Sequence, residues 1–133
     1  MNLSLTMDFQ YNKSIDKVWH ALTDSNMLEK WIWKNDFKPV VGYKFTFRAE
    51  PSEWWDGIVK GEVLEVDEPN KISYTWGTGH EEHVVTWTLT ETPDGNTNLH
   101  LDQTGIHTED GLKGAQYGWT NMSEELTKVL EEQ

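Results

Sequence analysis

The sequence contains no cysteine, and this absence excludes several kinds of site at once. A disulfide framework, a thiol nucleophile and a cysteine-ligated zinc centre all require that residue. Residues 1–11 contain neither a basic cluster nor a continuous apolar run, so they lack the features of a secretory signal. No apolar stretch reaches the length of a membrane span. We therefore expect a cytoplasmic protein without membrane insertion.

Basic residues are scarce as well. The chain has 11 lysines and arginines against 23 aspartates and glutamates, for a formal net charge of −12 at pH 7. Phosphate backbones and anionic lipid surfaces would be repelled by this charge, so we expect no nucleic-acid partner. A chain of 133 residues fits one domain, and we place that domain over residues 1–133.

Tryptophan, by contrast, is abundant, with eight copies in this short chain. Each large aromatic side chain can bury on the order of 150–250 Å². A core built from so many rings tends to fill unevenly, so we expect a cavity. The eight positions are Trp19, Trp31, Trp33, Trp54, Trp55, Trp76, Trp87 and Trp119.

Hydrophobic periodicity divides the chain into alternating segments. Residues 3–11 alternate apolar and polar side chains, which predicts a strand. Ser14 then precedes apolar residues at helical spacing as far as Leu22, and a second short helix is predicted to end near Trp31. From Phe37 the period returns to two.

The middle of the chain predicts a run of about six strands. Turn signals separate them at residues 68–70, 77–79 and 93–96, and the apolar face switches near Val63, which indicates a bulge. Short connections favour an antiparallel meander.

A long helix is predicted at the C-terminus from apolar residues at three-four spacing between Leu112 and Leu130. Gly114 and Gly118 lie beside this stripe. Glycine in a helix costs roughly 1 kcal/mol relative to alanine, so we expect a close backbone approach or a bend there.

The predicted architecture is α+β: strand, helix, helix, six-stranded antiparallel meander and long C-terminal helix. The apolar face of a curved sheet must be covered, and the long helix is large enough to cover it. A twisted sheet wrapped around a helix can leave space between the two.

The ordered motifs of this chain resemble the proteins related to the C-terminal domain of the Hsp90 ATPase activator. The resemblance implies the helix-grip fold of the START and Bet v 1-like superfamily, whose members typically bind apolar small molecules between sheet and long helix. The motifs that carry it are Ser14-Ile15-Asp16-Lys17-Val18-Trp19, Leu22-Thr23-Asp24, Trp31, Val41-Gly42-Tyr43-Lys44-Phe45, Gly61-Glu62-Val63, Tyr74-Thr75-Trp76, Val85-Thr86-Trp87-Thr88-Leu89 and Gly118-Trp119.

The candidate ligand-binding residues combine apolar bodies with a few polar tips, which is the usual composition of a small-molecule pocket. A tightly packed core, with its Tyr and Trp donors bonded to backbone carbonyls, is the alternative. The expected cavity lining is Trp31, Tyr43, Phe45, Phe47, Val59, Tyr74, Trp76, His83, Val85, Trp87, Leu101, Gln103, Tyr117, Trp119 and Met122.

Catalytic and metal sites are not predicted, and no cofactor is expected. His80 and His83 stand at i, i+3 on an expected strand, where odd spacing sends them to opposite faces, so they do not form a metal pair. His83 shares a face with Val85 and Trp87 and could hydrogen-bond within the cavity.

Three functions remain open from the sequence. The first is non-enzymatic binding of an apolar, ring-containing small molecule or lipid. The second, which rests on the resemblance alone, is an Hsp90-type co-chaperone or stress-related interaction protein. The third is a cyclase-like or dehydratase-like enzyme, for which His83 and Tyr74 are the only candidate catalytic groups.

Overall fold

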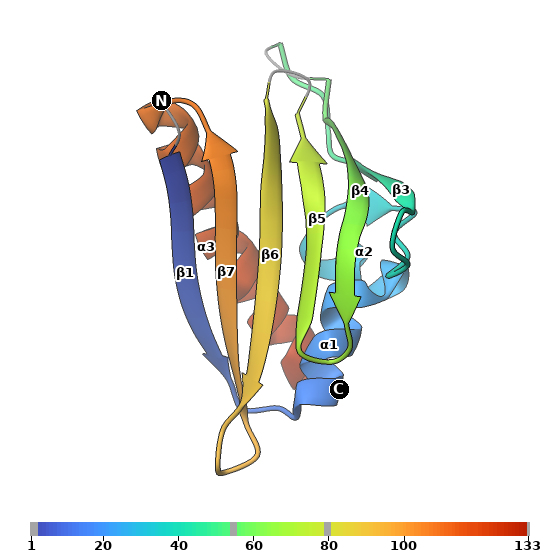
Figure 1. The fold of residues 1–133 in the computed structure, drawn as a ribbon, viewed down its shortest axis with the longest axis vertical. Coiled ribbons are helices and arrows are strands. Elements are labelled where there is room, and N and C mark those ends of the chain that lie inside the picture. The colour runs from blue at the N-terminus through green and yellow to red at the C-terminus, as the bar shows by residue number, and fades with distance from the viewer. Residues whose placement is uncertain (1–2, 54–55, 79–80, 133) are drawn as a thin grey trace.

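The computed structural model describes residues 3–53, 56–78 and 81–132. The predicted order of elements is confirmed, and Figure 1 shows their arrangement. Trp54, Trp55 and His80 lie outside the described residues. The elements are β1 Leu3–Tyr11, α1 Ile15–Thr23, α2 Ser25–Trp31, β2 Lys34–Asn35, β3 Lys44–Arg48, β4 Ile58–Asp67, β5 Lys71–Gly77, β6 Glu82–Glu91, β7 Thr97–Ile106 and α3 Glu109–Glu131.

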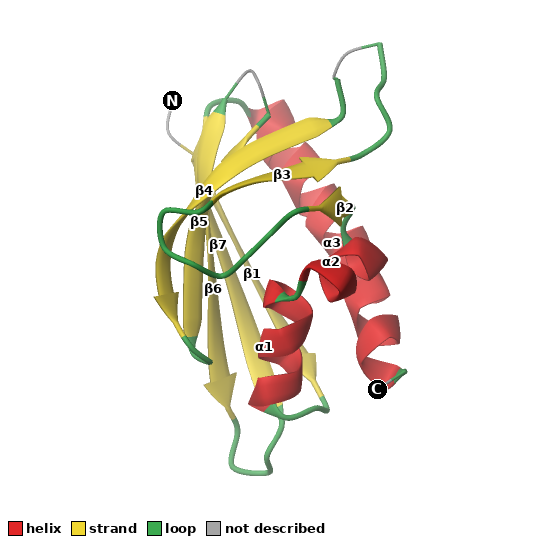
Figure 2. Cartoon of the chain, turned by 90° about the vertical axis from the view of Figure 1, so that its right-hand side faces the viewer, coloured by secondary structure: helices red, strands yellow, loops and turns green. Residues whose placement is uncertain are grey.

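The strands form one antiparallel sheet of seven strands in the order β1-β7-β6-β5-β4-β3-β2. The first strand therefore pairs with the last one, and the remaining strands follow as a meander. Figure 2 shows the sheet curving, with all three helices on its concave side. The helix-grip fold expected from the resemblance is the fold observed.

Two local predictions have different outcomes. The bulge expected near Val63 is confirmed, because the β4–β5 register shifts between Val63 and Glu65. The period of two noted from Phe37 onward gives a strand only from Lys44, since the chain after β2 is a loop. Pro39 cannot donate a ladder hydrogen bond, and Gly42 has a φ of +86°, a left-handed conformation that interrupts a strand.

Helices α1 and α2 meet at Asp24, which ends one helix and caps the next. Its carboxylate accepts a hydrogen bond from the backbone N of Met27 at 3.1 Å. The indole Nε1 of Trp31 donates to the carbonyl of Ala21 at 2.8 Å and ties the corner together. These two helices cover the part of the concave face that α3 leaves open (Figure 2).

Helix α3 begins at a capped end, where the Thr108 hydroxyl accepts from the backbone N of Gly111 at 2.9 Å. Its buried side is made by Trp119, Leu126, Val129 and Leu130. In the described part of the chain, no helix is long and apolar enough to cross a membrane.

Candidate functional site

Most of the space between sheet and helices is filled by aromatic rings. Phe45 packs against Phe47 and Tyr74 with ring centroids 5.5 and 5.3 Å apart. Trp119 contacts the rings of Trp76 and Trp87 at 5.5 and 5.3 Å. The predicted cavity is therefore replaced over much of its extent by a packed aromatic core.

A smaller pocket of about 150 Å³ remains between α3 and the sheet. Four of the predicted residues line it, namely Trp76, Gln103, Trp119 and Met122. The other lining residues are Trp33, Gly114, Ala115 and Gly118. Since Gly114 is exposed and Gly118 and Met122 are partly exposed, the pocket opens to the surface along this side of α3.

The two helix glycines shape the opening by leaving space. A methyl group built on either Gly114 or Gly118 would meet no atom within 4 Å other than its own helix backbone. The close backbone approach predicted for them is therefore wrong. They instead remove side chains from two successive turns of α3, which is what keeps the pocket open.

The remaining predicted lining residues lie outside this pocket. Six of them are core residues with 2 % or less of their surface exposed: Phe45, Phe47, Val59, Tyr74, Val85 and Leu101. Trp31 and Trp87 contact each other's rings at 6.2 Å, and the gap beside them and Trp119 has no room for a water molecule.

Two predicted residues lie at the surface. Tyr43 is partly exposed at the end of the β2–β3 loop, where the Lys38 Nζ lies 5.8 Å from its ring centroid. Tyr117 is 72 % exposed, so its assignment to the cavity lining is corrected. Its helical position, two residues before Trp119, turns its side chain away from the face that Trp119 buries.

A chain of buried polar groups runs from the pocket into the sheet. The indole Nε1 of Trp119 donates to Gln103 Oε1 at 2.7 Å. Because an indole nitrogen is only a donor, this contact fixes the amide orientation and turns Gln103 Nε2 toward His83 Nδ1, 2.7 Å away. His83 Nδ1 must then accept, which leaves the ring proton of the neutral imidazole on Nε2.

The series of hydrogen bonds from Trp119 through Gln103 ends at a polar atom of His83 that has no hydrogen bond of its own. His83 Nε2 is buried and has no hydrogen-bond partner among the described residues, although Glu81 Oε2 lies 3.5 Å from it. The second oxygen of Glu81 accepts from the backbone N of His107 at 2.7 Å. The imidazole is thus held from one side only, by Gln103.

Tyr74, the second residue considered for acid–base chemistry, is buried in the core and hydrogen-bonded there. Its hydroxyl accepts from Trp87 Nε1 at 2.8 Å. Burial raises the pKa of Tyr74 far above the usual value of a phenol, with the Trp87 hydrogen bond opposing the shift. Its phenol is therefore protonated at neutral pH, and Tyr74 is not among the residues that line the pocket.

The pocket offers an uncharged surface to a ligand. None of its described lining residues is ionisable, and within the described part of the chain no three His, Asp or Glu side chains cluster closely enough to hold a metal ion. The walls are indole rings and a thioether, and their polar groups are the Gln103 amide and the indole nitrogens of Trp33, Trp76 and Trp119. Such a site can hold a neutral apolar molecule and orient one polar group.

Sequence reasoning missed four lining residues that small size or position concealed. Gly114 and Gly118 were noted beside the apolar stripe of the helix. Whether they leave open space depends on the side chains that face them in the fold. Trp33 follows the end of α2, and its ring stacks on Trp76 at 6.3 Å, a contact that joins distant parts of the chain. Ala115 belonged to the predicted apolar stripe, which was the available signal.

Comparison with known proteins identifies relatives over nearly the whole chain. The family described as activator of Hsp90 ATPase homolog 1-like protein matches residues 12–131. The solved structure of protein MLL2253 from Mesorhizobium loti is 36% identical, with a TM-score of 0.89 and 98% of both chains covered. No curated protein sequence matches the chain.

More distant structures share the fold. CalU16 from Micromonospora echinospora is 22% identical with a TM-score of 0.82, over 96% of this chain and 75% of its own. DynU16, from the dynemicin biosynthetic locus, is 21% identical with a TM-score of 0.81, over 96% of this chain and 47% of its own.

Proposed function

This chain belongs to the activator of Hsp90 ATPase homolog 1-like family, and from that membership we propose that it is a non-enzymatic binding protein for a neutral, ring-bearing apolar small molecule. The observation that carries the proposal is the pocket of about 150 Å³ between α3 and the sheet. Its indole walls provide flat apolar surface, and Gln103 provides the polar group that orients a guest.

The size of the pocket sets the size of the guest. An apolar cavity of about 150 Å³ can hold a molecule the size of benzene. We therefore infer either a single-ring compound or a larger molecule that inserts one ring and leaves the remainder outside the glycine opening. A charged group on the inserted part would be left unpaired among uncharged walls, which is energetically costly.

Gln103 supports selectivity for a guest with one polar substituent. Its oxygen and nitrogen each make one hydrogen bond within the protein, to Trp119 and His83. A primary amide has a second acceptor lone pair and a second donor hydrogen, so one of each is left for a ligand. Phenols, anilines and ring ketones are the matching classes.

The experiment is a titration with a panel of such compounds, followed by tryptophan fluorescence and by amide chemical shifts. We expect binding below millimolar concentration, with the largest shifts at Trp76, Gln103 and Gly118. Absence of binding across the panel, or shifts confined to other regions, would refute the proposal.

A blocking variant separates pocket binding from surface binding. Leucine at Gly118 places a side chain in open space at the pocket mouth and raises helix propensity, so the fold should survive. We expect Gly118→Leu to abolish binding. Gln116→Leu adds the same side chain at an exposed position of the same helix and should bind as the unaltered protein does.

The family description supports a second candidate, an interaction with an Hsp90-type chaperone. Adding the protein to a purified bacterial or eukaryotic Hsp90 and measuring its ATPase rate tests this directly. An increase that survives in Gly118→Leu would show a chaperone role independent of the pocket, whereas an unchanged rate would remove the candidate.

A further inference from the structure

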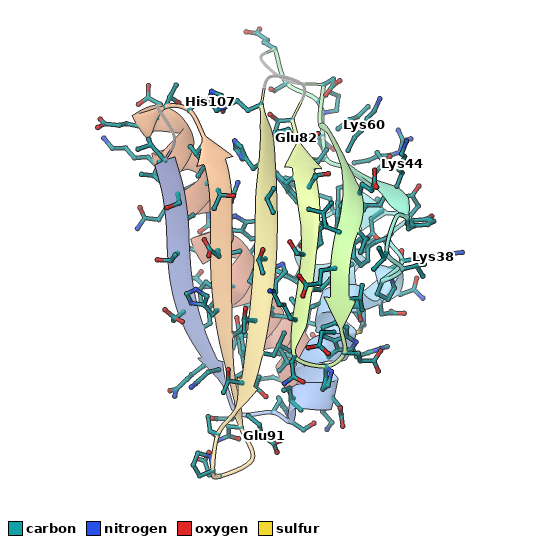
Figure 3. All side chains as sticks on the ribbon, viewed as in Figure 1. Lys38, Lys44, Lys60, Glu82, Glu91 and His107 are labelled. Atoms are coloured by element: carbon teal, nitrogen blue, oxygen red, sulfur yellow. The ribbon has the colours of Figure 1, made fainter. Side chains whose placement is uncertain are left out.

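Positive charge is concentrated on one part of this acidic protein. Residues 30–60 hold six of the 11 basic residues but four of the 23 acidic ones, so this segment carries +2 and the remainder −14. Four of the six are exposed on β2, β3 and β4, and we call them the basic face: Lys34, Lys44, Arg48 and Lys60. Figure 3 shows Lys44 and Lys60 on the same side of the molecule as Lys38.

The strand register brings these four side chains together. Lys34 lies directly opposite Arg48, and Lys60 lies opposite Thr46. Lys60 is therefore a diagonal neighbour of both Lys44 and Arg48 on the outer face, at a typical separation of about 7–8 Å. The inner positions of the same strands carry Phe45, Phe47 and Val59, which are buried.

Two acidic side chains adjoin the basic face: Glu62 lies opposite Lys44, and the Asp36 carboxylate accepts from the backbone N of Thr46, between Lys44 and Arg48. Across residues 3–53, 56–78 and 81–132, none of its four members forms an ion pair. Like charges directly opposite each other, as Lys34 and Arg48 are, destabilise a sheet. Stability of the fold therefore does not account for the Lys34–Arg48 pair, whereas binding of an anionic group would.

A surface hollow of about 270 Å³ lies at the Lys44–Lys60 end of this face. Thr46, Gly61 and Thr75 are among its lining residues. Glu62 and Glu82 line it as well, so the hollow itself has mixed charge. The excess of positive charge lies along β3 toward Arg48, and an anionic chain would follow that direction.

Exposed apolar side chains adjoin the same end. Val40 and Val41 are 57 % and 61 % exposed, and Leu64 is exposed as well. The turn that carries the valines is fixed to β4, because the Gly42 N donates to the Val63 carbonyl at 2.8 Å and the Val63 N donates to the Tyr43 carbonyl at 3.0 Å. An exposed apolar patch rimmed by polar residues is typical of a protein interaction site.

We propose that the basic face, together with Val40, Val41 and Leu64, docks an acidic segment of a partner protein. Carboxylates of that segment lie against Lys44, Arg48 and Lys60, and an apolar residue of it covers the valines. Screening confines charge effects to about 8 Å at physiological salt, so a short segment responds to this face rather than to the net charge of the protein.

The probe for this proposal is a fluorescein-labelled peptide of about ten alternating Glu and Leu residues. Its anisotropy is measured against the full-length protein, and a twin with Gln in place of Glu serves as the uncharged reference. We expect the Glu peptide to bind more tightly than the Gln peptide, with binding that weakens as salt is raised from about 20 to about 300 mM.

Charge reversal locates the site. The variant Lys44→Glu with Lys60→Glu should weaken binding about tenfold or more. Lys17→Glu with Lys113→Glu makes the same change in net charge at exposed lysines elsewhere, and should change the affinity by less than about threefold. Val40→Ser with Val41→Ser should weaken the Glu-Leu peptide but leave a Glu-Ser peptide unaffected.

Four results would overturn the proposal. The first is equal weakening by both charge-reversal variants, and the second is a Gln peptide that binds as tightly as the Glu peptide. The third is a dimer of the protein alone in sedimentation that Lys44→Glu with Lys60→Glu dissociates, which would make a second copy the occupant. The fourth is retention on phosphatidylserine vesicles that the same variant abolishes. Circular dichroism of each variant confirms that its fold is retained.

Discussion

Trp119 and Gln103 are joined by a hydrogen bond of 2.7 Å that links the long helix to the last strand at the wall of the pocket. Both side chains are buried, with 4% and 2% of their surface exposed. The bond determines which end of the amide faces Trp119, and through the amide it determines which nitrogen of His83 accepts.

The first prediction concerns Gln103→Leu. Leucine has a similar size but leaves the Trp119 N–H and His83 Nδ1 without partners in a buried region, and each such group costs about 1–3 kcal/mol. We expect the free energy of unfolding to fall by about 2–4 kcal/mol in urea denaturation. Gln10→Leu, at an exposed position of β1, should change it by less than about 0.5 kcal/mol. Equal effects of the two substitutions would contradict the hydrogen-bond chain.

The second prediction compares two glycines. Gly118→Ala places its methyl group in open space on a helix, so the protein should gain up to about 1 kcal/mol in stability. Gly61→Ala should instead cost about 1–3 kcal/mol, because its methyl group would collide with the Thr75 carbonyl oxygen and the Phe45 ring. Thermal unfolding measures both. A loss of stability in Gly118→Ala would mean that the pocket mouth is narrower than described.

The third prediction concerns alkaline pH. Burial raises the pKa of Tyr74 above its usual value of about 10, so the unfolded chain loses this proton before the folded protein does. The corresponding stability is present below about pH 10 and declines above it by about 1.4 kcal/mol per pH unit. Burial also raises the pKa of Tyr11, which adds to the same decline.

Urea denaturation between about pH 9 and about pH 11.5 tests this linkage. Tyr74→Phe should be less stable at neutral pH, because Trp87 Nε1 loses its acceptor, yet its stability should fall less steeply above pH 10. Tyr117→Phe, at an exposed side chain, should reproduce the curve of the unaltered protein. Parallel curves for Tyr74→Phe and the unaltered protein would contradict the prediction.

The fourth prediction is the tautomer of His83. Since Gln103 Nε2 donates to Nδ1, the neutral ring must carry its hydrogen on Nε2. Long-range proton–nitrogen correlation spectra of the neutral ring should show Nδ1 with the chemical shift of a bare nitrogen and Nε2 with that of a protonated one. The reverse pattern would require a rotated Gln103 amide and a broken bond to Trp119.

The sequence predicted the fold well because each element has strong local periodicity. The alternation in β1 and the bulge near Val63 are visible in short windows of sequence. The period of two noted from Phe37 shows the limit of this reasoning, because the chain from there to Tyr43 is a loop. Phe37 is buried because its ring packs on Phe45 at 5.0 Å, and a buried loop residue has the same sequence signal as a strand residue.

The candidate site was predictable only in part, because its shape depends on how completely neighbouring side chains fill space. Periodicity placed Trp76, Gln103 and Trp119 on inward faces, and all three line the pocket. It could not show that Phe45 and Tyr74 would fit closely enough to exclude a ligand. Nor could it show that Gly118 faces open space, since that depends on the distance between the helix and Trp33.

The lack of side chains at Gly114 and Gly118, on successive turns of α3, also affects how fast a bound molecule exchanges with solvent. A guest that enters through the side of a helix crosses no strand and separates no hydrogen-bonded pair, so the fold can stay intact while the molecule arrives and departs. Loading and release would then occur at rates far faster than global unfolding. Under the proposed binding function, exchange of the guest is therefore independent of unfolding.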